Sequence, residues 1–276
     1  MYFLGLDEFI RRALDEDIGT GDITTISCIP EDAVSKGVFR AKEPGIICGI
    51  DILTRVFAML DEEVVVTPFV SDGALVEKGD TIAEIKGNSR IILSGERVAL
   101  NLIQRLSGIA TRTHAAVKQV SGTNAYIVDT RKTTPGLRVL EKYAVKTGGG
   151  KNHRFNLADG VLIKDNHIKA AGGIAEAIEA VRKTAPHTLK IEVETETAEQ
   201  IDEALAAGAD IIMLDNMTLD EMAAAVRRIN GRALVEASGN MGERNLREVA
   251  KTGVDFISIG ALTHTVKALD ISLKFI

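Results

Sequence analysis

The sequence predicts an α/β protein whose second half is an α/β barrel. Short apolar segments alternate there with helical patterns, which is typical of parallel strands covered by helices on both faces. The last four segments end 21, 23 and 22 residues apart, an interval that fits one strand plus one helix. The first hundred residues lack this repeat. The six segments end at Asp129, Lys164, Glu194, Asp215, Ser238 and Gly260.

Six strands are two fewer than a regular barrel has. An incomplete or irregular barrel and a closed one therefore both remain open at this point. A doubly wound parallel sheet is the second choice, and no glycine-rich dinucleotide-binding pattern follows a strand to support it.

Two helices of the second half carry clear start and stop signals. Thr197 and Thr218 occupy the positions of N-caps, each before a segment with apolar residues on one helical face. Gly208 and Gly231 follow these segments as stops.

The first part of the chain reads as a separate domain. An opening helix ends near Gly19 and Gly21, residues 34–95 alternate in β fashion between turns, and a helical pattern runs from about Glu96 to Val120. We predict domains at 1–107 and 108–265. The tail 266–276 ends in a strand pattern that we expect to return to the first domain.

Composition excludes several classes of protein. With 45% hydrophobic and 26% charged residues, the chain reads as globular, and no apolar run approaches the roughly 20 residues of a membrane span. Cys28 and Cys48 cannot form a disulfide framework, which favours a cytoplasmic location. A net charge of −6 with 4% aromatic residues argues against nucleic acid as a partner.

Positive charge gathers in one segment of this acidic chain. Residues 129–169 hold nine Lys or Arg and four acidic residues, a charge of +5, so the rest of the chain carries −11. Such an island attracts anions.

Acidic residues at the strand ends point to a second kind of ligand. Glu192 and Glu194 share one strand face, and unpaired burial would be costly, so we expect both near the barrel rim with Lys164 as partner. Glu194 is the better site candidate and Glu192 a structural ion-pair member. Carboxylates suit sugar hydroxyls or a Mg²⁺ carried by a diphosphate, as with Glu194 and Asp215.

Two loops after strands could bind anions. Gly148–Gly150 precede His153 and Arg154. We interpret this segment as a loop of the site in preference to a flexible linker. The segments 238–240 and 258–264 hold small residues that suit a phosphate, although tight turns would look similar. His153 and His167 lack metal-ligand spacing, so we predict no metal held by the protein alone.

Motifs along nearly the whole chain resemble quinolinate phosphoribosyltransferases. They are "EDIGTGDIT", "GERVALNLIQRLSGIAT", "DTRKTTPGLRVLEKYAV", "GGGKNHRFNL", "LIKDNH", "IEVE", "IMLDN" and "ISIGALTH". The resemblance implies an N-terminal α/β sandwich domain and an open, irregular α/β barrel. It also implies a homodimer or a larger assembly, in which the N-terminal domain of one subunit completes the site of another.

The resemblance also implies the roles of single residues. Quinolinate would be bound by Arg131, His153, Arg154 and Lys164, together with Arg97 from the partner subunit. Without the resemblance, the spacing of Arg97 places it in a solvated helical stripe with Asn101 and Arg105. Phosphoribosyl diphosphate would be bound by Thr130, Lys132, Glu194, Asp215, Ser238, Gly239, Gly260 and His264, and the implied catalytic residues are Lys132, Lys164, Glu194 and Asp215. Asn240 departs from the family, which usually has a second glycine there.

The implied reaction is phosphoribosyl transfer to quinolinate with loss of CO₂, which gives nicotinate mononucleotide and diphosphate with Mg²⁺ as cofactor. Two alternatives stay open: a paralogue that acts on another acid, and a non-catalytic barrel that binds a phosphorylated metabolite. A carrier-domain reading of the first domain would require a modified lysine, and no carrier motif is present.

Overall fold

The computed structural model describes residues 5–276, which separate into two compact units. The first contains residues up to His114, Val139–Gly148 and Val266–Ile276, and the second contains Ala115–Arg138 and Gly149–Thr265. The predicted boundary near residue 107 stays a prediction, because compactness within one chain does not show which segment folds alone.

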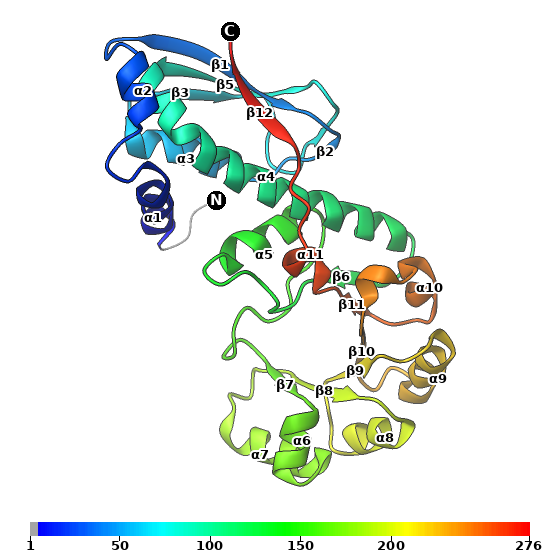
Figure 1. The fold of residues 1–276 in the computed structure, drawn as a ribbon. Coiled ribbons are helices and arrows are strands. Elements are labelled where there is room, and N and C mark those ends of the chain that lie inside the picture. The colour runs from blue at the N-terminus through cyan, green and yellow to red at the C-terminus, as the bar shows by residue number, and fades with distance from the viewer. Residues whose placement is uncertain (1–4) are drawn as a thin grey trace. The chain divides into compact units, whose positions relative to one another are not determined.

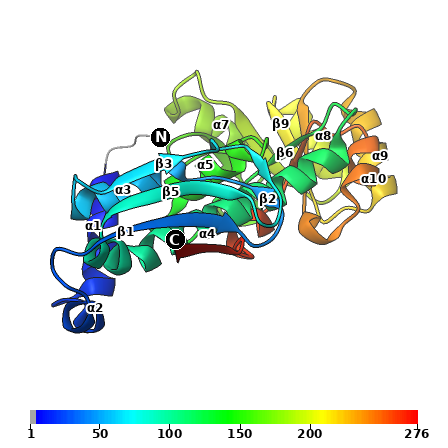
Figure 2. The ribbon, with the colours of Figure 1, turned by 90° about the horizontal axis from the view of Figure 1, so that it is seen from above.

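The first unit is built on a four-stranded sheet of order β12-β1-β5-β3 whose pairs are all antiparallel (Figures 1 and 2). Helix α3 and the first part of α4 cover one face of this sheet (Figure 1). This arrangement is the α/β sandwich that the sequence predicts. Its elements are α1 (Leu6–Ile18), α2 (Ile23–Cys28), β1 (Val34–Ala41), β2 (Gly45–Ile46), α3 (Ile50–Leu60), β3 (Val65–Pro68), β4 (Leu75–Val76), β5 (Thr81–Asn88), α4 (Ser89–Val120), α5 (Arg138–Thr147) and β12 (Ile271–Phe275).

Helix α3 corrects the expectation of β structure throughout residues 34–95. Its apolar residues suit a strand as well as a helix, and four of them, Ile50, Leu53, Val56 and Phe57, lie on one buried helical face. Asp72 decides the outcome, because its carboxylate accepts the backbone N–H groups of Gly49 and Ile50 where the helix begins.

The C-terminal strand joins the sheet of the first unit. β12 pairs antiparallel with β1 from Ala41↔Ile271 to Gly37↔Phe275, and Ile271 is buried. Before it, the backbone N–H of Leu269 donates to the carbonyl of Gln104 in α4.

The second unit contains a six-stranded parallel sheet of order β6-β11-β10-β9-β8-β7. All six predicted strands are present. The sheet stays open between β6 and β7, where only a single bridge joins Val128 to Lys151, so the fold is an irregular, open α/β barrel. The strands are β6 (Tyr126–Val128), β7 (Val161–Ile163), β8 (Ile191–Thr195), β9 (Ile211–Asp215), β10 (Leu234–Ser238) and β11 (Phe256–Ser258).

Helices lie outside these strands, with α8, α9 and α10 at the periphery of the unit (Figure 1). Thr197 and Thr218 are the predicted N-caps, and each forms a capping box with the residue three positions later. The helices are α6 (Asp165–Ala171), α7 (Ile174–Thr184), α8 (Ala198–Ala206), α9 (Leu219–Ile229), α10 (Leu246–Lys251), α11 (Ala261–His264) and a 3₁₀ turn at Met241–Glu243.

A buried ion pair joins α4 to α5 inside the first unit. Glu141 is fully buried, and Arg105 donates to its Oε1 from both Nη2, at 2.6 Å, and Nε, at 3.0 Å. Arg105 therefore does not belong to a solvated stripe as its spacing from Arg97 suggests, because the packing of α5 covers it.

No helix within residues 5–276 is both long and apolar enough to cross a membrane.

We predict that Gly108→Ala destabilises the protein, although alanine normally stabilises a helix relative to glycine. The added methyl carbon would lie 2.1 Å from the carbonyl oxygen of Lys267, a backbone atom that cannot rotate away. Urea unfolding should show a loss of about 1 to 3 kcal/mol. Gly95→Ala is the control with a smaller loss, because its nearest atoms are the side-chain ends of Leu60 and Phe57. Unchanged stability of Gly108→Ala would contradict this packing.

Candidate functional site

The carboxyl ends of the parallel strands surround a hollow of about 390 Å³. Side chains from five strands, β7 to β11, and from two loops line it, as expected for this edge of a parallel sheet. Nine of the residues predicted for the site are among them: Thr130, Arg131, Lys132, His153, Arg154, Lys164, Glu194, Asp215 and Ser238.

Two arginines enter the hollow from different loops. The Arg154 side chain donates to the Gly160 carbonyl at 2.9 Å, which fixes its orientation. Burial and the neighbouring Arg131 charge lower the pKa of Arg154, and the Glu192 charge opposes this. The buried Nε of Arg131 has no hydrogen-bond partner among the described residues, so an anion in the hollow would supply a missing acceptor.

Buried Asp129 fixes the loop that carries His153 and Arg154. One carboxylate oxygen accepts the backbone N–H of His153 at 2.9 Å, and the other accepts the Asn152 amide at 2.6 Å. The preceding glycines have structural reasons to be there: a methyl carbon on Gly148 would lie 2.4 Å from the Ala110 carbonyl oxygen, and Gly149 has a φ of +92°. Asp129 thus holds the loop rather than a ligand.

The acidic side of the hollow combines two strand ends. Glu194 lies 3.7 Å from Lys164, as expected, and Asp215 accepts a hydrogen bond from the Asn216 amide at 2.7 Å. Burial raises the pKa of Glu194, Lys164 opposes the rise and Asp215 adds to it. Both carboxylates line the same hollow, and carboxylates suit a polyhydroxyl group or a cation.

The turn after β10 admits only certain residues. Gly239 has a φ of +97°, and a methyl carbon on it would lie 2.3 Å from Oδ1 of Asn216. Asn240 has a φ of +51°, a left-handed conformation that asparagine tolerates better than most residues. Asparagine can therefore occupy this position with less backbone strain than most other side chains.

The loops after β6 and β11 pack on each other. A methyl carbon on Gly260 would lie 3.0 Å from the Lys132 side chain, 3.2 Å from His264 and 3.4 Å from the Thr130 hydroxyl oxygen. Thr263 donates to the carbonyl of Lys132 at 2.8 Å. The predicted Gly260 and His264 thus lie beside the residues that line the hollow.

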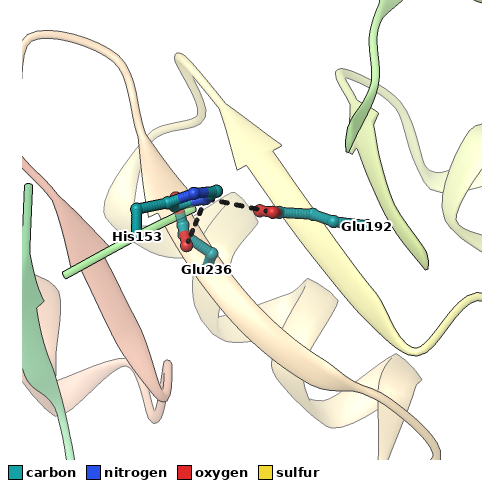
Figure 3. A group of neighbouring side chains, drawn as sticks. All are labelled: His153, Glu192 and Glu236. Carbon is teal, nitrogen blue, oxygen red and sulfur yellow. Dashed lines mark ion pairs between the residues drawn. The ribbon is translucent and has the colours of Figure 1, made fainter. Parts of the chain in front are cut away.

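Glu192 does not lie near the rim with Lys164, so that expectation is wrong. It is 4% exposed, and its Oε2 lies 3.0 Å from Nε2 of His153 (Figure 3). Glu236, on β10, approaches the same nitrogen from another side at 3.6 Å and is 3% exposed. These ligand-type atoms all lie within 4.8 Å of one another.

The sequence analysis misses Glu236 as a site residue. A signal is present, because Glu236 interrupts the apolar segment "LVEAS" two residues before Ser238, on the same strand face. Glu192 holds the same position relative to Glu194. Arg97 lies in the first unit, where its side chain is exposed on α4, so its predicted role in the site stays a prediction.

Comparisons with known proteins match the chain throughout. A family model described as "Quinolinate phosphoribosyl transferase, C-terminal domain" matches residues 109–274, and the corresponding N-terminal model matches 22–107.

Relatives and solved structures agree with these models. A Bacillus subtilis (strain 168) protein named "Probable nicotinate-nucleotide pyrophosphorylase (carboxylating)" is 49% identical, with 99% of this chain and 94% of that protein covered. A Mycobacterium leprae protein named nicotinate-nucleotide pyrophosphorylase (carboxylating) is 46% identical, with 96% and 95% covered. The structure of the nicotinate-nucleotide pyrophosphorylase from Francisella tularensis matches with a TM-score of 0.94 at 43% identity, covering 98% of this chain and 95% of that one.

We predict that Glu236→Gln changes how stability depends on pH. Burial, followed by the Glu192 charge, raises the pKa of Glu236 from 4.5 to about 8, while His153 and the Ser258 hydroxyl oppose the rise. The raised pKa means that the stability this group contributes is complete below pH 4.5 and is lost as pH rises towards 8.

The free energy of unfolding of the wild type should therefore fall relative to Glu236→Gln by up to about 1.4 kcal/mol per pH unit between these limits. Urea unfolding of both proteins at pH 5, 6, 7 and 8 measures this difference. A constant difference across that range would contradict a raised pKa.

Proposed function

Because the chain belongs to the quinolinate phosphoribosyltransferase family, we infer that it transfers the phosphoribosyl group of 5-phosphoribosyl 1-diphosphate to quinolinate. The transfer is accompanied by decarboxylation and yields nicotinate mononucleotide, diphosphate and CO₂, a step of NAD biosynthesis. The observation that carries this function is the hollow itself, which four cations line together with the acidic residues Glu194, Asp215 and Glu236.

The cations suit a planar diacid. Arg131, Arg154 and Lys164 line one hollow with His153, and guanidinium groups bind carboxylates through paired hydrogen bonds. The unpartnered Nε of Arg131 supports an acceptor at this place. The three cations bind the two carboxylates of quinolinate, and His153 lies beside them.

The opposite side of the hollow suits the sugar diphosphate. Glu194 and Asp215 would accept hydrogen bonds from the ribose hydroxyls, and they lie where they could also hold a Mg²⁺ carried by the diphosphate, whose charge would offset that of the leaving group. Lys132 lies between the two substrates. The residues proposed for phosphoribosyl diphosphate are Thr130, Lys132, Glu194, Asp215, Ser238, Gly239, Gly260 and His264.

The chemistry requires positioning and fixed charge more than proton transfer. The bond between C1 of the ribose and the diphosphate breaks, and its electron pair leaves with the diphosphate while the pyridine nitrogen forms the new bond to C1. The bond from the ring to the 2-carboxylate then breaks, CO₂ departs, and the electron pair left on the ring carbon takes up a proton. Lys132 and Lys164 offset negative charge throughout.

A second subunit completes the site in this proposal. Arg97 is exposed on α4, and as a cation from a partner subunit it would add a further contact to a substrate carboxylate. The protein then acts as a homodimer or a larger symmetric assembly with shared sites. A cytoplasmic location also stays a prediction.

The first test is the reaction itself. Protein, quinolinate, phosphoribosyl diphosphate and Mg²⁺ should yield nicotinate mononucleotide and CO₂ in equal amounts, measured by chromatography and ¹⁴CO₂ release. Nicotinate in place of quinolinate is the control, and no product is expected from it. Product from nicotinate, with no gas released, would contradict the carboxylating assignment and favour another acid as substrate.

The second test is complementation between inactive variants. Arg97→Ala and Lys164→Ala should each be inactive, and an equal mixture should regain about one quarter of wild-type activity, because half the dimers are mixed and each has one intact site. Lys164→Ala mixed with Arg131→Ala is the matched control and should stay inactive, since both changes lie in the same half of the site. No recovery despite measured subunit exchange would contradict the shared site.

A further inference from the structure

Glu192 and Glu236 form a buried carboxylate pair behind the substrate hollow. They come from β8 and β10, and both side chains point at the imidazole of His153 (Figure 3). The Oε1 atoms of both are buried without a hydrogen-bond partner among the described residues. Two carboxylates in this position cannot both remain ionised without a compensating positive charge.

A charged His153 would lower the pKa of Glu236, but the geometry around the ring argues for a neutral imidazole. Its Nδ1 accepts the backbone N–H of Arg154 at 2.7 Å, so this nitrogen carries no proton. The single ring proton is therefore on Nε2, which lies between the two carboxylates. A neutral imidazole donates one hydrogen bond and leaves one carboxylate without a partner.

The remaining proton belongs on Glu236. Glu192 is the nearer acceptor for Nε2 and also interacts with the positive charge of Arg154. Glu236 is beyond hydrogen-bonding distance at 3.6 Å, and its register neighbour on β9 is the apolar Met213. Burial together with the Glu192 charge favours the neutral acid, as the raised pKa of Glu236 reflects, and Ser258 on β11 only partly opposes this.

The position of this proton matters for anion binding, because Glu236 lines the same hollow as the cations. We propose that Glu236 is a positioning residue that stays neutral so that these cations remain available to a dicarboxylate, and that its ionisation weakens dicarboxylate binding. This rests on the proposed function. An ionised Glu236 would repel the substrate directly and would attract the Arg131, Lys132, Arg154 and Lys164 charges that the substrate needs; Glu194 and Asp215 are the other charged groups of the hollow.

A second hollow allows the proton to exchange while the first is occupied. It has a volume of about 420 Å³ and is lined by Glu192. His153, Arg154 and Glu236 line both hollows and therefore lie between them. Asp159 and Lys190 are the other charged residues that line it. Water in this second hollow would reach Glu236 without passing the substrate.

Calorimetric binding of benzene-1,2-dicarboxylate tests the proposal, because this diacid lacks the ring nitrogen and cannot react. The wild-type dissociation constant should rise about tenfold from pH 7 to pH 9, because a group with a pKa of about 8 is mostly protonated at the first pH and mostly ionised at the second. Glu236→Gln should bind at pH 7 as the wild type does and change less than twofold. Glu179→Gln, which removes an exposed carboxylate from α7, should follow the wild type.

The wild type alone gives a second readout. Titrations at pH 8.5 in two buffers with different ionisation enthalpies should show uptake of about 0.8 proton per bound diacid, if binding restores the proton to a group with a pKa of about 8. This measurement does not depend on a variant that folds.

Three results would overturn the proposal: no proton uptake at pH 8.5, the same pH dependence in Glu236→Gln and wild type, or one tightly held divalent metal ion per wild-type chain that Glu236→Gln lacks. The last would place an ion where we place the proton. None of these measurements depends on turnover of quinolinate. A protein that fails to turn over quinolinate yet shows the predicted uptake would refute only the proposed function.

Discussion

Charged side chains in the interior of the second unit depend on one constraint: each buried ionised group requires an opposite charge, a hydrogen-bond donor or a proton. Asp129 satisfies it through the backbone of His153 and the amide of Asn152, and in doing so fixes the loop that carries the site. His153 then donates to Glu192, and a proton neutralises Glu236. The loop, the imidazole and the pair of carboxylates form one network, so a change in any member alters the charge that a ligand meets.

The parallel sheet arranges the acidic and polar side chains of its strands in two layers. Because side chains alternate along a strand, residues two apart face the same interior at different depths. Glu194 and Ser238 lie at the mouth, where ligands arrive, and Glu192 and Glu236 lie one layer deeper. In the proposed function, the outer layer contacts the substrate and the deeper layer sets the electrostatic potential there. Such a division explains why acidic residues occur within strands that are otherwise apolar.

The first unit obeys the same constraint with different groups. Glu141 is buried in α5 and paired with Arg105 of α4, and Asp72 both caps α3 and accepts the Tyr143 hydroxyl. Helix α5 lies in the chain between the loop of Arg131 and the loop of His153. Its packing on α4, with Gly148 against Ala110, therefore anchors a segment whose two ends both lead into the site.

Sequence patterns alone identified the six parallel strands, the caps at Thr197 and Thr218 and the basic segment, because period and capping chemistry are local properties of the chain. The sequence motifs identified the family and predicted most of the residues that line the hollow. Local patterns could not separate helix from strand at residues 50–60, where the apolar run fits both and Asp72, more than ten residues away, decides.

The tertiary structure alone decided which charged groups are buried together. Arg105 leaves the stripe it shares with Arg97 because α5 packs over it, and Glu192 meets His153 instead of Lys164 because loop and strand converge inside the sheet. The pKa of Glu236 is set by burial and by Glu192 and His153, which are far away in sequence. Spacing along the chain determines only which face of a strand or helix each side chain occupies. Protonation and ion pairing depend instead on distances between elements, and those distances follow from how the strands and loops pack.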